Sequence, residues 1–470
     1  MNRRSFIRQL LGGSVFLSTL KGLSCGTSNK SPNIILIYID DLGWRDTGFM
    51  GSTFYRTPNI DSLAESGMIF TNAYANAPNC APSRASLMTG LYTPRHGIFT
   101  VGSPRRGDSR NRKLIPVPNE VTLDSGFITL PEVLKANGYK TAHMGKWHLG
   151  TGPETGPAAQ GFDINIGGTQ AGSPKSYFSP YRNPKLQDGP PGEYLTDRLT
   201  AESIQFIRNH RNEPFFLYLS HYAVHTPIQA KPGMKSKYKS RRGTEGQNSP
   251  DYAAMIESVD QGIGDIINCL NKHKLRQDTL ILFFSDNGGF GPITSMAPLR
   301  GSKGMLYEGG IRVPLIFSWP GTIAAGSNCD VPVIGIDIFP PLLTLAGISS
   351  KSDIGLDGEC LSVLINQTGD ISRTSLYWHF PAYLEAYRGM KGFWRTTPAG
   401  AIRKKNWKLI EFFEDDALEL YNLEEDIGET RNLIGERPEK GLELLKDLRK
   451  WRNSVNAPVP SELNPEYSPY

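Results

Sequence analysis

The chain has 470 residues, of which 39% are hydrophobic and 21% charged, and its formal net charge is +5. This composition is typical of a globular protein with one large and one smaller domain. Four positive charges and no acid fall within the first 24 residues. The remainder is therefore close to neutral, and its charge gives no reason to expect a nucleic-acid partner. Five cysteines are too few for a disulfide scaffold.

The N-terminal 25 residues have the pattern of an export signal. A basic start with a twin-arginine pair at 3–4 precedes a short apolar run at 10–20, which is too short to span a bilayer. Gly-Leu-Ser-Cys then ends at Cys25 and resembles a bacterial lipobox imperfectly. Residues 1–25 are therefore predicted to direct export to the periplasm or to an outer-membrane anchor. Two alternatives stay open for Cys25: lipidation, or ordinary signal cleavage.

Residues 33–39 form a continuous β-branched run that predicts a buried parallel strand. Asp40 and Asp41 follow it directly. Open α/β sheets place ligand sites at the carboxyl ends of their strands, and two adjacent carboxylates favour a divalent cation such as Ca²⁺ or Mg²⁺. The alternative for this pair is a solvated turn. A short helix at 57–64 and a strand at 68–74 are expected next.

The stretch 80–90 reads Cys-Ala-Pro-Ser-Arg-Ala-Ser-Leu-Met-Thr-Gly. Pro82 suits the first turn of a helix and Gly90 its end, so Cys80 is expected just outside the helix N-terminus. That end carries partial positive charge and free N–H groups, and Arg84 can reach back toward it. The pattern indicates a sulfur-bearing side chain beside an anion pocket. For Cys80 alone, a buried structural cysteine is the competing interpretation.

Two basic loops, at 103–126 and 231–242, are expected to be solvated, although the first has a second interpretation as a rim that attracts a polyanionic substrate. A helix at 129–137 and a strand at 139–143 lead to Lys146 and His148, whose alternation lets both side chains share one face. Residues 151–193 are rich in glycine and proline, and we expect a long loop that shapes a pocket.

The next segments repeat the order of helix, strand and polar residues. A helix at 195–210 and a strand at 214–220 precede His225, and a long amphipathic helix at 251–273 precedes a strand at 279–285. Asp286 and Asn287 follow that strand and offer two more oxygen donors, although Asp-Asn-Gly-Gly alone is simply a turn. Lys303 lies in a glycine-rich block at 299–314. The remaining elements expected in this half are a strand at 313–318 and a helix at 338–345.

Beyond residue 350 the pattern changes to short antiparallel strands, expected near 376–380, 401–410 and 418–423, followed by a helix at 438–451. The predicted fold class is α/β. A large, mostly parallel mixed sheet flanked by helices is expected over 31–350, and a small antiparallel sheet with a helix over 351–470. Outside Cys25 and Cys80, at most one disulfide is possible among the remaining cysteines, and the pairing stays open: Cys269, Cys329 and Cys360.

The segment at 80–90 and the hexapeptide Gly-Lys-Trp-His-Leu-Gly at 145–150 resemble the signatures of the sulfatase family, within the alkaline phosphatase superfamily. The block at 299–314 is similar to a further family motif. This resemblance covers nearly the whole mature chain and implies a formylglycine-dependent, arylsulfatase-like enzyme. It also implies that a maturation enzyme oxidises Cys80 to formylglycine, whose hydrated aldehyde is the nucleophile.

The resemblance assigns roles to further residues. The implied metal is Ca²⁺, with Mg²⁺ as the alternative, and its ligands are Asp40, Asp41, Asp286, Asn287 and the formylglycine at position 80. The implied sulfate-binding and proton-transfer groups are Arg84, Lys146, His148, His225 and Lys303. His379 is a further candidate for the sugar site, with core packing as its alternative.

Export suggests glycan breakdown, so the expected substrate is a sulfated glycosaminoglycan or algal polysaccharide fragment. The alternatives are an arylsulfatase acting on small esters, a phosphatase or phosphonate hydrolase of the same superfamily, and a sulfated-glycan binding protein without catalysis. The sugar, the sulfated hydroxyl and the endo or exo mode of action are left open by the sequence.

Overall fold

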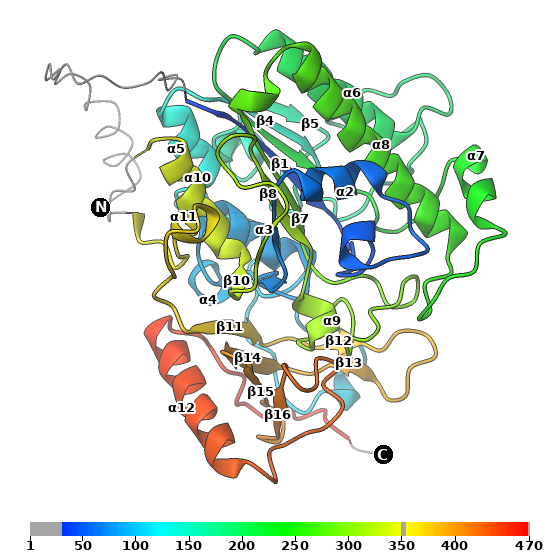
Figure 1. The fold of residues 1–470 in the computed structure, drawn as a ribbon. Helices are drawn as coiled ribbons and strands as arrows, with labels where there is room; N and C mark the ends of the chain where they lie inside the picture. The colour runs from blue at the N-terminus through cyan, green and yellow to red at the C-terminus, as the bar shows by residue number, and fades with distance from the viewer. Residues whose placement is uncertain (1–30, 349–353, 469–470) are drawn as a thin grey trace, which may run out of the picture.

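The computed structural model describes residues 31–348 and 354–468. The predicted export signal, Cys25 and the expected domain boundary near residue 350 lie outside these ranges. A large sheet with helices on both faces forms one part of the molecule, and a small sheet with a single long helix packs at one end of it (Figure 1).

The large sheet has the order β5-β4-β6-β1-β7-β8-β2-β9. Every registered pair is parallel except the two made by β8, which runs against β7 and β2. The predicted mostly parallel mixed sheet is therefore confirmed. Its strands are β1 (Asn33–Ile39), β2 (Met68–Phe70), β4 (Lys140–Gly145), β5 (Ile164–Ile166), β6 (Phe215–Ser220), β7 (Thr279–Ser285), β8 (Leu315–Ser318) and β9 (Ser327–Cys329).

The central strand β1 shows why the sheet is covered on both faces. Successive side chains of a strand point to opposite faces. Ile35, Ile37 and Ile39 pack into one hydrophobic cluster, whereas Ile34, Leu36 and Tyr38 pack into another. All of these side chains are at most 1% exposed. A strand buried on both faces needs an uninterrupted apolar run, and this is the pattern from which the strand was predicted.

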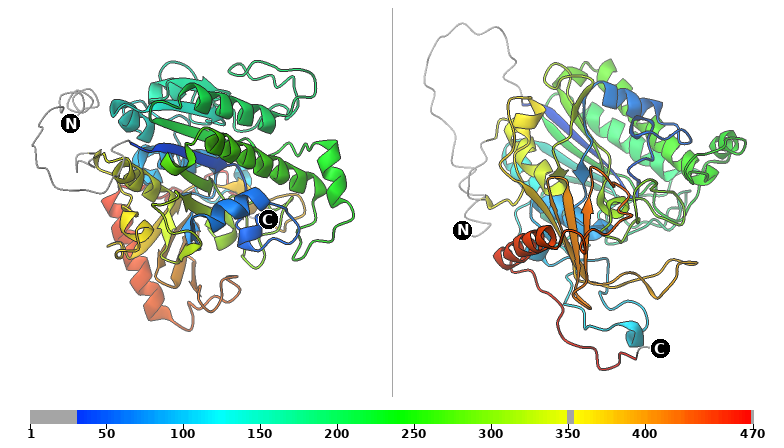
Figure 2. Two further views of the ribbon diagram at one scale, coloured as in Figure 1. Left: turned by 45° about the horizontal axis from the view of Figure 1, so that its top comes forward. Right: turned by 60° about the horizontal axis from the view of Figure 1, so that its bottom comes forward.

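Each cluster is closed by its own set of helices (Figures 1 and 2). The cluster of Ile35 includes residues of α2, α6 and α8, and the cluster of Ile34 includes residues of α3, α5 and α10. Their bounds are α2 (Pro58–Glu65), α3 (Cys80–Thr89), α5 (Leu130–Ala136), α6 (Leu195–Asn209), α8 (Pro250–Lys272) and α10 (Phe339–Leu345). The shorter helices are α4 (Thr93–His96), α7 (Pro232–Lys235), α9 (Glu308–Ile311) and α11 (Ser362–Ile365).

Two predicted segments differ from the structure. The strand expected at 68–74 is split, because after β2 the chain leaves the large sheet and forms β3 (Ala73–Tyr74), which pairs with β10 (Val333–Ile334). The loop expected at 151–193 contains β5, which extends the sheet beyond β4. β5 is only three residues long and half-buried, so it carries little hydrophobic periodicity from which to predict a strand.

The C-terminal part contains a small antiparallel sheet, as predicted, and its four strands have the order β11-β14-β15-β16. The helix α12 (Pro438–Ser454) packs on it through Leu444, Leu448 and Trp451. A two-stranded hairpin, formed by β12 and β13, was not predicted. The strands are β11 (Ser375–Phe380), β12 (Leu384–Glu385), β13 (Trp394–Thr396), β14 (Ala399–Lys404), β15 (Trp407–Phe412) and β16 (Leu418–Asn422).

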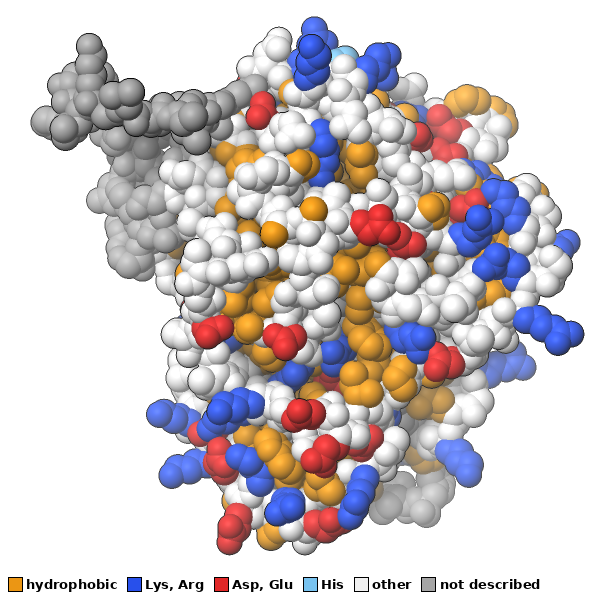
Figure 3. Space-filling view, in the orientation of Figure 1, with side chains coloured by type: hydrophobic (Ala, Val, Ile, Leu, Met, Phe, Trp, Pro, Cys, Tyr) orange, Lys and Arg blue, Asp and Glu red, His pale blue; other side chains and the backbone are white. Residues whose placement is uncertain are grey.

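The basic loop at 231–242 contains the short helix α7. Lys and Arg side chains gather in this region, at the right edge of Figure 3. Lys231, Lys235 and Lys237 pair with acidic side chains of α6 and α8. The loop was expected to be solvated, and its pairing with these acidic side chains was not predicted. Within residues 31–348 and 354–468, no helix combines the length and the apolar character needed to cross a membrane. None of the cysteines in these ranges forms a disulfide.

Candidate active site

The predicted site residues follow adjacent parallel strands. β4, β6, β1 and β7 are neighbours in the sheet and run in the same direction. Their carboxyl ends therefore meet at one edge, where open α/β sheets bind ligands. Asp40 and Asp41 follow β1, Lys146 follows β4, His225 follows β6, and Asp286 follows β7.

A close approach between β4 and β6 fixes the position of Lys146. Gly145 has a φ of 105°, and a Cβ on it would lie 1.9 Å from the carbonyl oxygen of Ser220. Only glycine fits such a contact in the left-handed region. The amide of Lys146 donates to the same carbonyl at 2.7 Å. β4 ends here, and His148 has a φ of 64°, so the strand alternation expected for Lys146 and His148 does not apply.

Cys80 is the first residue of α3 rather than a residue just outside it. Asn79 takes the N-cap position in an extended conformation, and Gly90 ends the helix at a φ of 68°. Ser83 fixes the approach to the helix, because its Oγ accepts from the amide of Ala77 at 3.1 Å and donates to the carbonyl of Ala77 at 2.9 Å. Cys80 is buried, and burial raises the pKa of its thiol.

The acidic residues gather around Cys80. Ligand atoms of Asp40, Cys80 and Asp286 lie within 4.8 Å of one another, and those of Asp40, Asp41 and His225 form a second such group. The side-chain nitrogen of Asn287, Nδ2, donates to Asp41 Oδ1 at 2.8 Å. Segments that are far apart in sequence therefore meet beside the N-terminus of α3, as the family resemblance implies.

Arg84 connects this cluster to the ends of three strands. Its Nη2 and Nε donate to Asp286 Oδ2 at 2.7 and 3.0 Å, and its Nη1 donates to the carbonyl of Lys146 at 3.1 Å and to Ser220 Oγ. The guanidinium also lies 5.1 Å from the centroid of the Tyr38 ring. A buried guanidinium with this many fixed partners has little freedom to turn away from the site.

Two lysine side chains pair with the aspartates that follow β1. Lys146 Nζ lies 2.7 Å from Asp40 Oδ2, and Lys303 Nζ lies 2.6 Å from Asp41 Oδ1. The nearby carboxylate of Asp41 raises the pKa of Lys303 despite its burial, whereas Lys303 and His225 lower the pKa of Asp41. The Lys303 side chain is therefore charged at neutral pH, and both lysines place their amino groups at a largely buried position.

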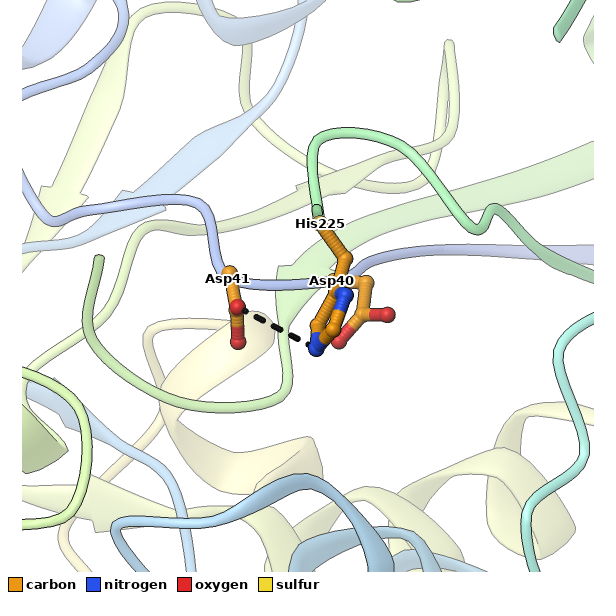
Figure 4. Close-up of side chains that lie close together, drawn as sticks. All are labelled: Asp40, Asp41 and His225. Carbon is orange, nitrogen blue, oxygen red and sulfur yellow. Dashed lines mark ion pairs between the residues drawn. The ribbon is translucent and has the colours of Figure 1, made fainter. Parts of the chain in front are cut away.

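The two histidines are neutral at neutral pH. Burial and the charge of Lys303 lower the pKa of His225 to about 3, and burial together with Lys146 lowers the pKa of His148. Figure 4 shows His225 facing the aspartates, with Nε2 3.7 Å from Asp41 Oδ2. Its Nδ1 lies 2.7 Å from the carbonyl of Thr226. This bond assigns the proton to Nδ1, so Nε2 is the nitrogen free to exchange a proton.

The donor set fits a hard divalent cation. Three carboxylates gather here, and Asn287 contacts Asp41 through its side-chain nitrogen. Two oxygens of these residues, Asp40 Oδ1 and Asn287 Oδ1, are buried without a hydrogen-bond partner in the described chain. Burial raises the pKa of Asp40, and the neighbouring carboxylates of Asp286 and Asp41 act in the same direction. A cation bound to these oxygens would offset both the desolvation and the repulsion.

The block at 299–314 is anchored from the C-terminal sheet. Glu308 accepts from Lys408 Nζ at 2.9 Å and from Arg312 at 3.3 Å, and Lys408 also pairs with Glu429 at 2.8 Å. Lys408 and Glu308 are fully buried. Glu308 and Arg312 therefore brace this block, and Lys408 and Glu429 attach it to the C-terminal part.

His379 is the one proposed site residue that the structure does not bring into the cluster. It lies on β11 and is 2% exposed, and its ring packs against Phe99 and Phe413. Its Nε2 lies 2.8 Å from the carbonyl of Pro458. These contacts correspond to the packing alternative, because the rings and carbonyl around His379 leave it almost no surface. Conversely, Ser220 belongs to the site and was missed, although its place at the end of a predicted strand was a usable signal.

Comparisons with known proteins agree with this geometry. Residues 32–348 match the Sulfatase family model, and residues 302–454 match a model described as N-sulphoglucosamine sulphohydrolase, C-terminal. A sulfatase of Formosa agariphila is 32% identical over 92% of this chain and 90% of its own. Human N-acetylgalactosamine-6-sulfatase is 31% identical over 80% of this chain and 74% of its own.

Solved structures show the same fold. The crystal structure of Ps i-CgsB in complex with k-i-k-neocarrahexaose aligns with a TM-score of 0.76 at 32% identity, covering 93% of this chain and 95% of that chain. A phosphonate monoester hydrolase of Agrobacterium radiobacter aligns with a TM-score of 0.68 at 21% identity, covering 90% of this chain and 96% of its own, and shows the likeness of fold alone. The chain belongs to the sulfatase family of sulfuric ester hydrolases.

Proposed function

We propose that this protein hydrolyses a sulfate monoester on a sulfated carbohydrate, using a formylglycine made from Cys80 and a Ca²⁺ ion. The single observation that carries the proposal is the gathering of Cys80, Asp40 and Asp286 within 4.8 Å of one another, beside three buried cations. The relatives named above include a galactosamine-6-sulfatase and a protein solved with a neocarrahexaose, which supports a glycan substrate.

Two groups supplied after synthesis would complete the site. The hydrated aldehyde of formylglycine, produced by a maturation enzyme, supplies the oxygen nucleophile, and Ca²⁺ supplies Lewis-acid stabilisation of the sulfate oxygens. Asp40, Asp41, Asp286 and Asn287 would hold the ion, because the three carboxylates gather and because Asp40 Oδ1 and Asn287 Oδ1 lack hydrogen-bond partners among the described residues. Oxygen donors from several rigid strand ends suit Ca²⁺, with Mg²⁺ as the alternative.

The remaining residues of the chain bind and orient the sulfate. Arg84, Lys146 and Lys303 provide fixed positive charge in a site with little water, where such charge acts most strongly on a developing negative charge. His225 Nε2 is the atom placed to give a proton to the departing oxygen. Burial disfavours the protonated form of this ring, whereas the negative charge of a bound sulfate favours it. His148 lies among the same charges and would accept a proton at the nucleophile side.

The alternatives differ in the ester that is hydrolysed. A phosphatase or phosphonate hydrolase of the same fold would turn over phosphate or phosphonate esters, and a glycan-binding protein would bind without turnover. The fold does not separate these functions, since the phosphonate monoester hydrolase shares it. The chemical state of Cys80 decides whether the proposed nucleophile is present, because an unmodified buried thiol with a raised pKa is a poor nucleophile.

The test is expression with and without a formylglycine-generating maturation enzyme. We expect the peptide that contains Cys80 to show the mass of the aldehyde only with that enzyme, and hydrolysis of sulfate esters to follow the aldehyde content. Cys80→Ala should remove activity, whereas Cys360→Ala, at a free and half-buried cysteine, should retain it. Full activity of Cys80→Ala, or hydrolysis of phosphonate but not sulfate esters, would overturn the proposal.

The substrate class is tested with a panel of defined sulfated saccharides from glycosaminoglycans and algal polysaccharides. We expect at least one member to react faster than small aryl sulfates, because only a saccharide extends beyond the sulfate into the surrounding loops. Reaction with aryl sulfates alone would favour the arylsulfatase alternative.

The proposed location is the periplasm or a membrane-anchored, exported state, supported by the sequence of residues 1–25. Metabolic labelling with a radioactive fatty acid in a bacterial host distinguishes the two fates of Cys25. Labelling that is lost in Cys25→Ala shows a lipid anchor, and an unlabelled protein shortened at its N-terminus shows ordinary cleavage.

A further inference from the structure

A second cationic position lies next to the sulfate-binding lysine. Arg395 belongs to β13, in the hairpin beside α9 (Figure 1). Its guanidinium covers the residue that follows Lys303, because a Cβ built on Gly304 would lie 2.6 Å from Arg395 Nε. The ring of Tyr387 stacks on it, with 4.3 Å between the guanidinium carbon and the ring centroid. The Tyr387 hydroxyl donates to the Lys303 carbonyl at 2.6 Å, so the hairpin is attached to the catalytic loop.

Arg395 has no anionic partner within residues 31–348 and 354–468. It forms no ion pair with a described residue, and its buried Nε lacks a hydrogen-bond acceptor. Burial lowers the pKa of this guanidinium, and the groups that act on it include Arg106 and Asp41. The exposed Glu385 also acts on it, but that carboxylate accepts from the amide of Gly107 at 3.1 Å. Largely buried guanidinium groups normally have acceptors.

Arg106 comes from the first basic loop, which packs against the same hairpin. Its Nη2 donates to the carbonyl of Val101 at 2.6 Å, and no carboxylate of the described chain pairs with it. The indole of Trp394 donates to the carbonyl of Asn111 at 3.0 Å and holds loop and hairpin together. Two guanidinium groups without anionic partners among the described residues thus belong to a loop and a hairpin that contact each other, although these segments are far apart in sequence.

There is room for a ligand around this pair. Arg395 lines a cavity of about 200 Å³ together with Tyr307 and Thr396. A larger cavity, of about 550 Å³, is lined by residues that include Ser302, Tyr387 and Met390. A saccharide whose sulfate contacts Lys303 would have neighbouring groups within reach of these spaces.

We propose that Arg395, stacked on Tyr387 and supported by Arg106, binds a second negatively charged group of the substrate. This inference rests on the proposed sulfatase function and narrows its substrate to saccharides with at least two anionic groups. The second group is a sulfate or a carboxylate, since the planar fork of arginine matches both. Stacking on Tyr387 holds the guanidinium in place before the substrate arrives.

The test compares matched saccharides that carry the same scissile sulfate. One has no other charge, a second has an additional sulfate, and a third has a neighbouring uronate. We expect Arg395→Gln to lower kcat/KM about 10- to 100-fold for the matching doubly charged saccharide, mainly through KM, because a charge-assisted hydrogen-bonded contact is lost. The loss for the singly charged saccharide should stay below about threefold. Arg395→Lys should give an intermediate value.

The matched control is Lys391→Gln, which removes one positive charge from an exposed position of the same hairpin. It should leave the preference between the saccharides unchanged. Equal losses on all saccharides with Arg395→Gln, or no loss on any, would overturn the inference. The second of these outcomes leaves the sulfatase proposal intact, because wild-type turnover would still be observed.

A binding measurement separates the two proposals further. In Cys80→Ala, which cannot form the aldehyde, calorimetry with the doubly charged saccharide reports on the subsite without turnover. We expect Arg395→Gln in this background to weaken binding by a similar factor. Unchanged affinity would overturn the inference, whereas weakened affinity together with inactive but aldehyde-containing wild-type enzyme would overturn the sulfatase proposal alone.

Discussion

The site residues depend on partners that are themselves fixed by the backbone. Arg84 is held by Asp286 and by the carbonyl of Lys146, so its position follows from the ends of β4 and β7. Asp41 and His148 have φ values of 62° and 64°. Left-handed conformations of residues other than glycine cost energy and cluster at functional sites. Here they turn the chain sharply just after a strand, which places consecutive side chains on different sides of the cluster.

The neutral state of His379 gives a prediction for stability at low pH. Burial and the charge of Arg452 lower its pKa to about 4 in spite of its bond to the Pro458 carbonyl, whereas an unfolded histidine titrates near pH 6.5. The unfolded state therefore binds more protons between these values, and stability contributed by His379 is lost as the pH falls from about 7 toward 4. The contribution of His379 to the free energy of unfolding is expected to fall by on the order of 1–2 kcal/mol between pH 8 and pH 5.

His379→Gln removes this titration while an amide can still donate to the Pro458 carbonyl. Its melting temperature should depend less steeply on pH between 5 and 8 than that of the wild type, as followed by scanning fluorimetry. The wild-type slope includes other histidines with lowered pKa values, such as His96 and His221, so only part of it should disappear. A large loss of kcat/KM in the variant would instead restore a role for His379 at the substrate.

At the scale of elements, the C-terminal sheet supports the loop that carries Lys303. Lys408 of β15 reaches Glu308 at the start of α9, and Glu429 accepts from the amide of Glu308 at 2.6 Å. The pKa of Glu308 is lowered by Lys408 and Arg312, whereas burial raises the pKa of Glu429 to about 7. A single ammonium group thus serves two carboxylates that have no contact with water.

Removal of the Lys408 ammonium group should therefore strongly lower the free energy of unfolding. Lys408→Met leaves buried charge without its partner, at an expected cost of about 3–5 kcal/mol, which lowers the melting temperature of a chain of this length by about 3–5 °C. Lys404→Met is the control, because Lys404 pairs with Glu443 and Asp447 at the surface and such pairs contribute little. Adding Glu429→Gln to Lys408→Met should recover part of the loss. An unchanged melting temperature in Lys408→Met would show that this network does not hold the loop.

The sequence predicted the strands whose side chains are buried on both faces and failed on short strands with partly exposed side chains. β1 and β7 were predicted with correct bounds, because a run of apolar residues is required wherever both faces of a strand are buried. The β12–β13 hairpin has two- and three-residue strands with partly exposed side chains, so its sequence has no usable period. Cys80 was placed one position outside its helix because helix ends are the least determined part of a pattern.

At the scale of the whole molecule, the site is a consequence of sheet order. The sequence shows which residues follow each strand, but not that β4, β6, β1 and β7 are neighbours. Long-range pairing of this kind leaves no local signal, so the gathering of Asp40, Asp41, Asp286 and Asn287 was inferred from resemblance. The position of Arg395 beside the Lys303 loop likewise depends on how the C-terminal part packs on the large sheet, which no local pattern of the sequence shows.

The convergence of strand ends gives a last prediction, on metal binding. After treatment with a chelator, Ca²⁺ should bind and raise the melting temperature, since an ion at 100 times its Kd contributes about 2.7 kcal/mol to stability. Asn287→Ala removes a neutral oxygen ligand, Oδ1, which has no hydrogen-bond partner among the described residues. The substitution changes no charge, and it should weaken Ca²⁺ binding at least about tenfold. Asn328→Ala, at an exposed position of β9, is the matched control. Calorimetry with Ca²⁺ and Mg²⁺ on each protein measures the effect. Equal Ca²⁺ affinity in Asn287→Ala and wild type would place the ion elsewhere. Tighter binding of Mg²⁺ than of Ca²⁺ would identify Mg²⁺ as the metal instead of the proposed Ca²⁺.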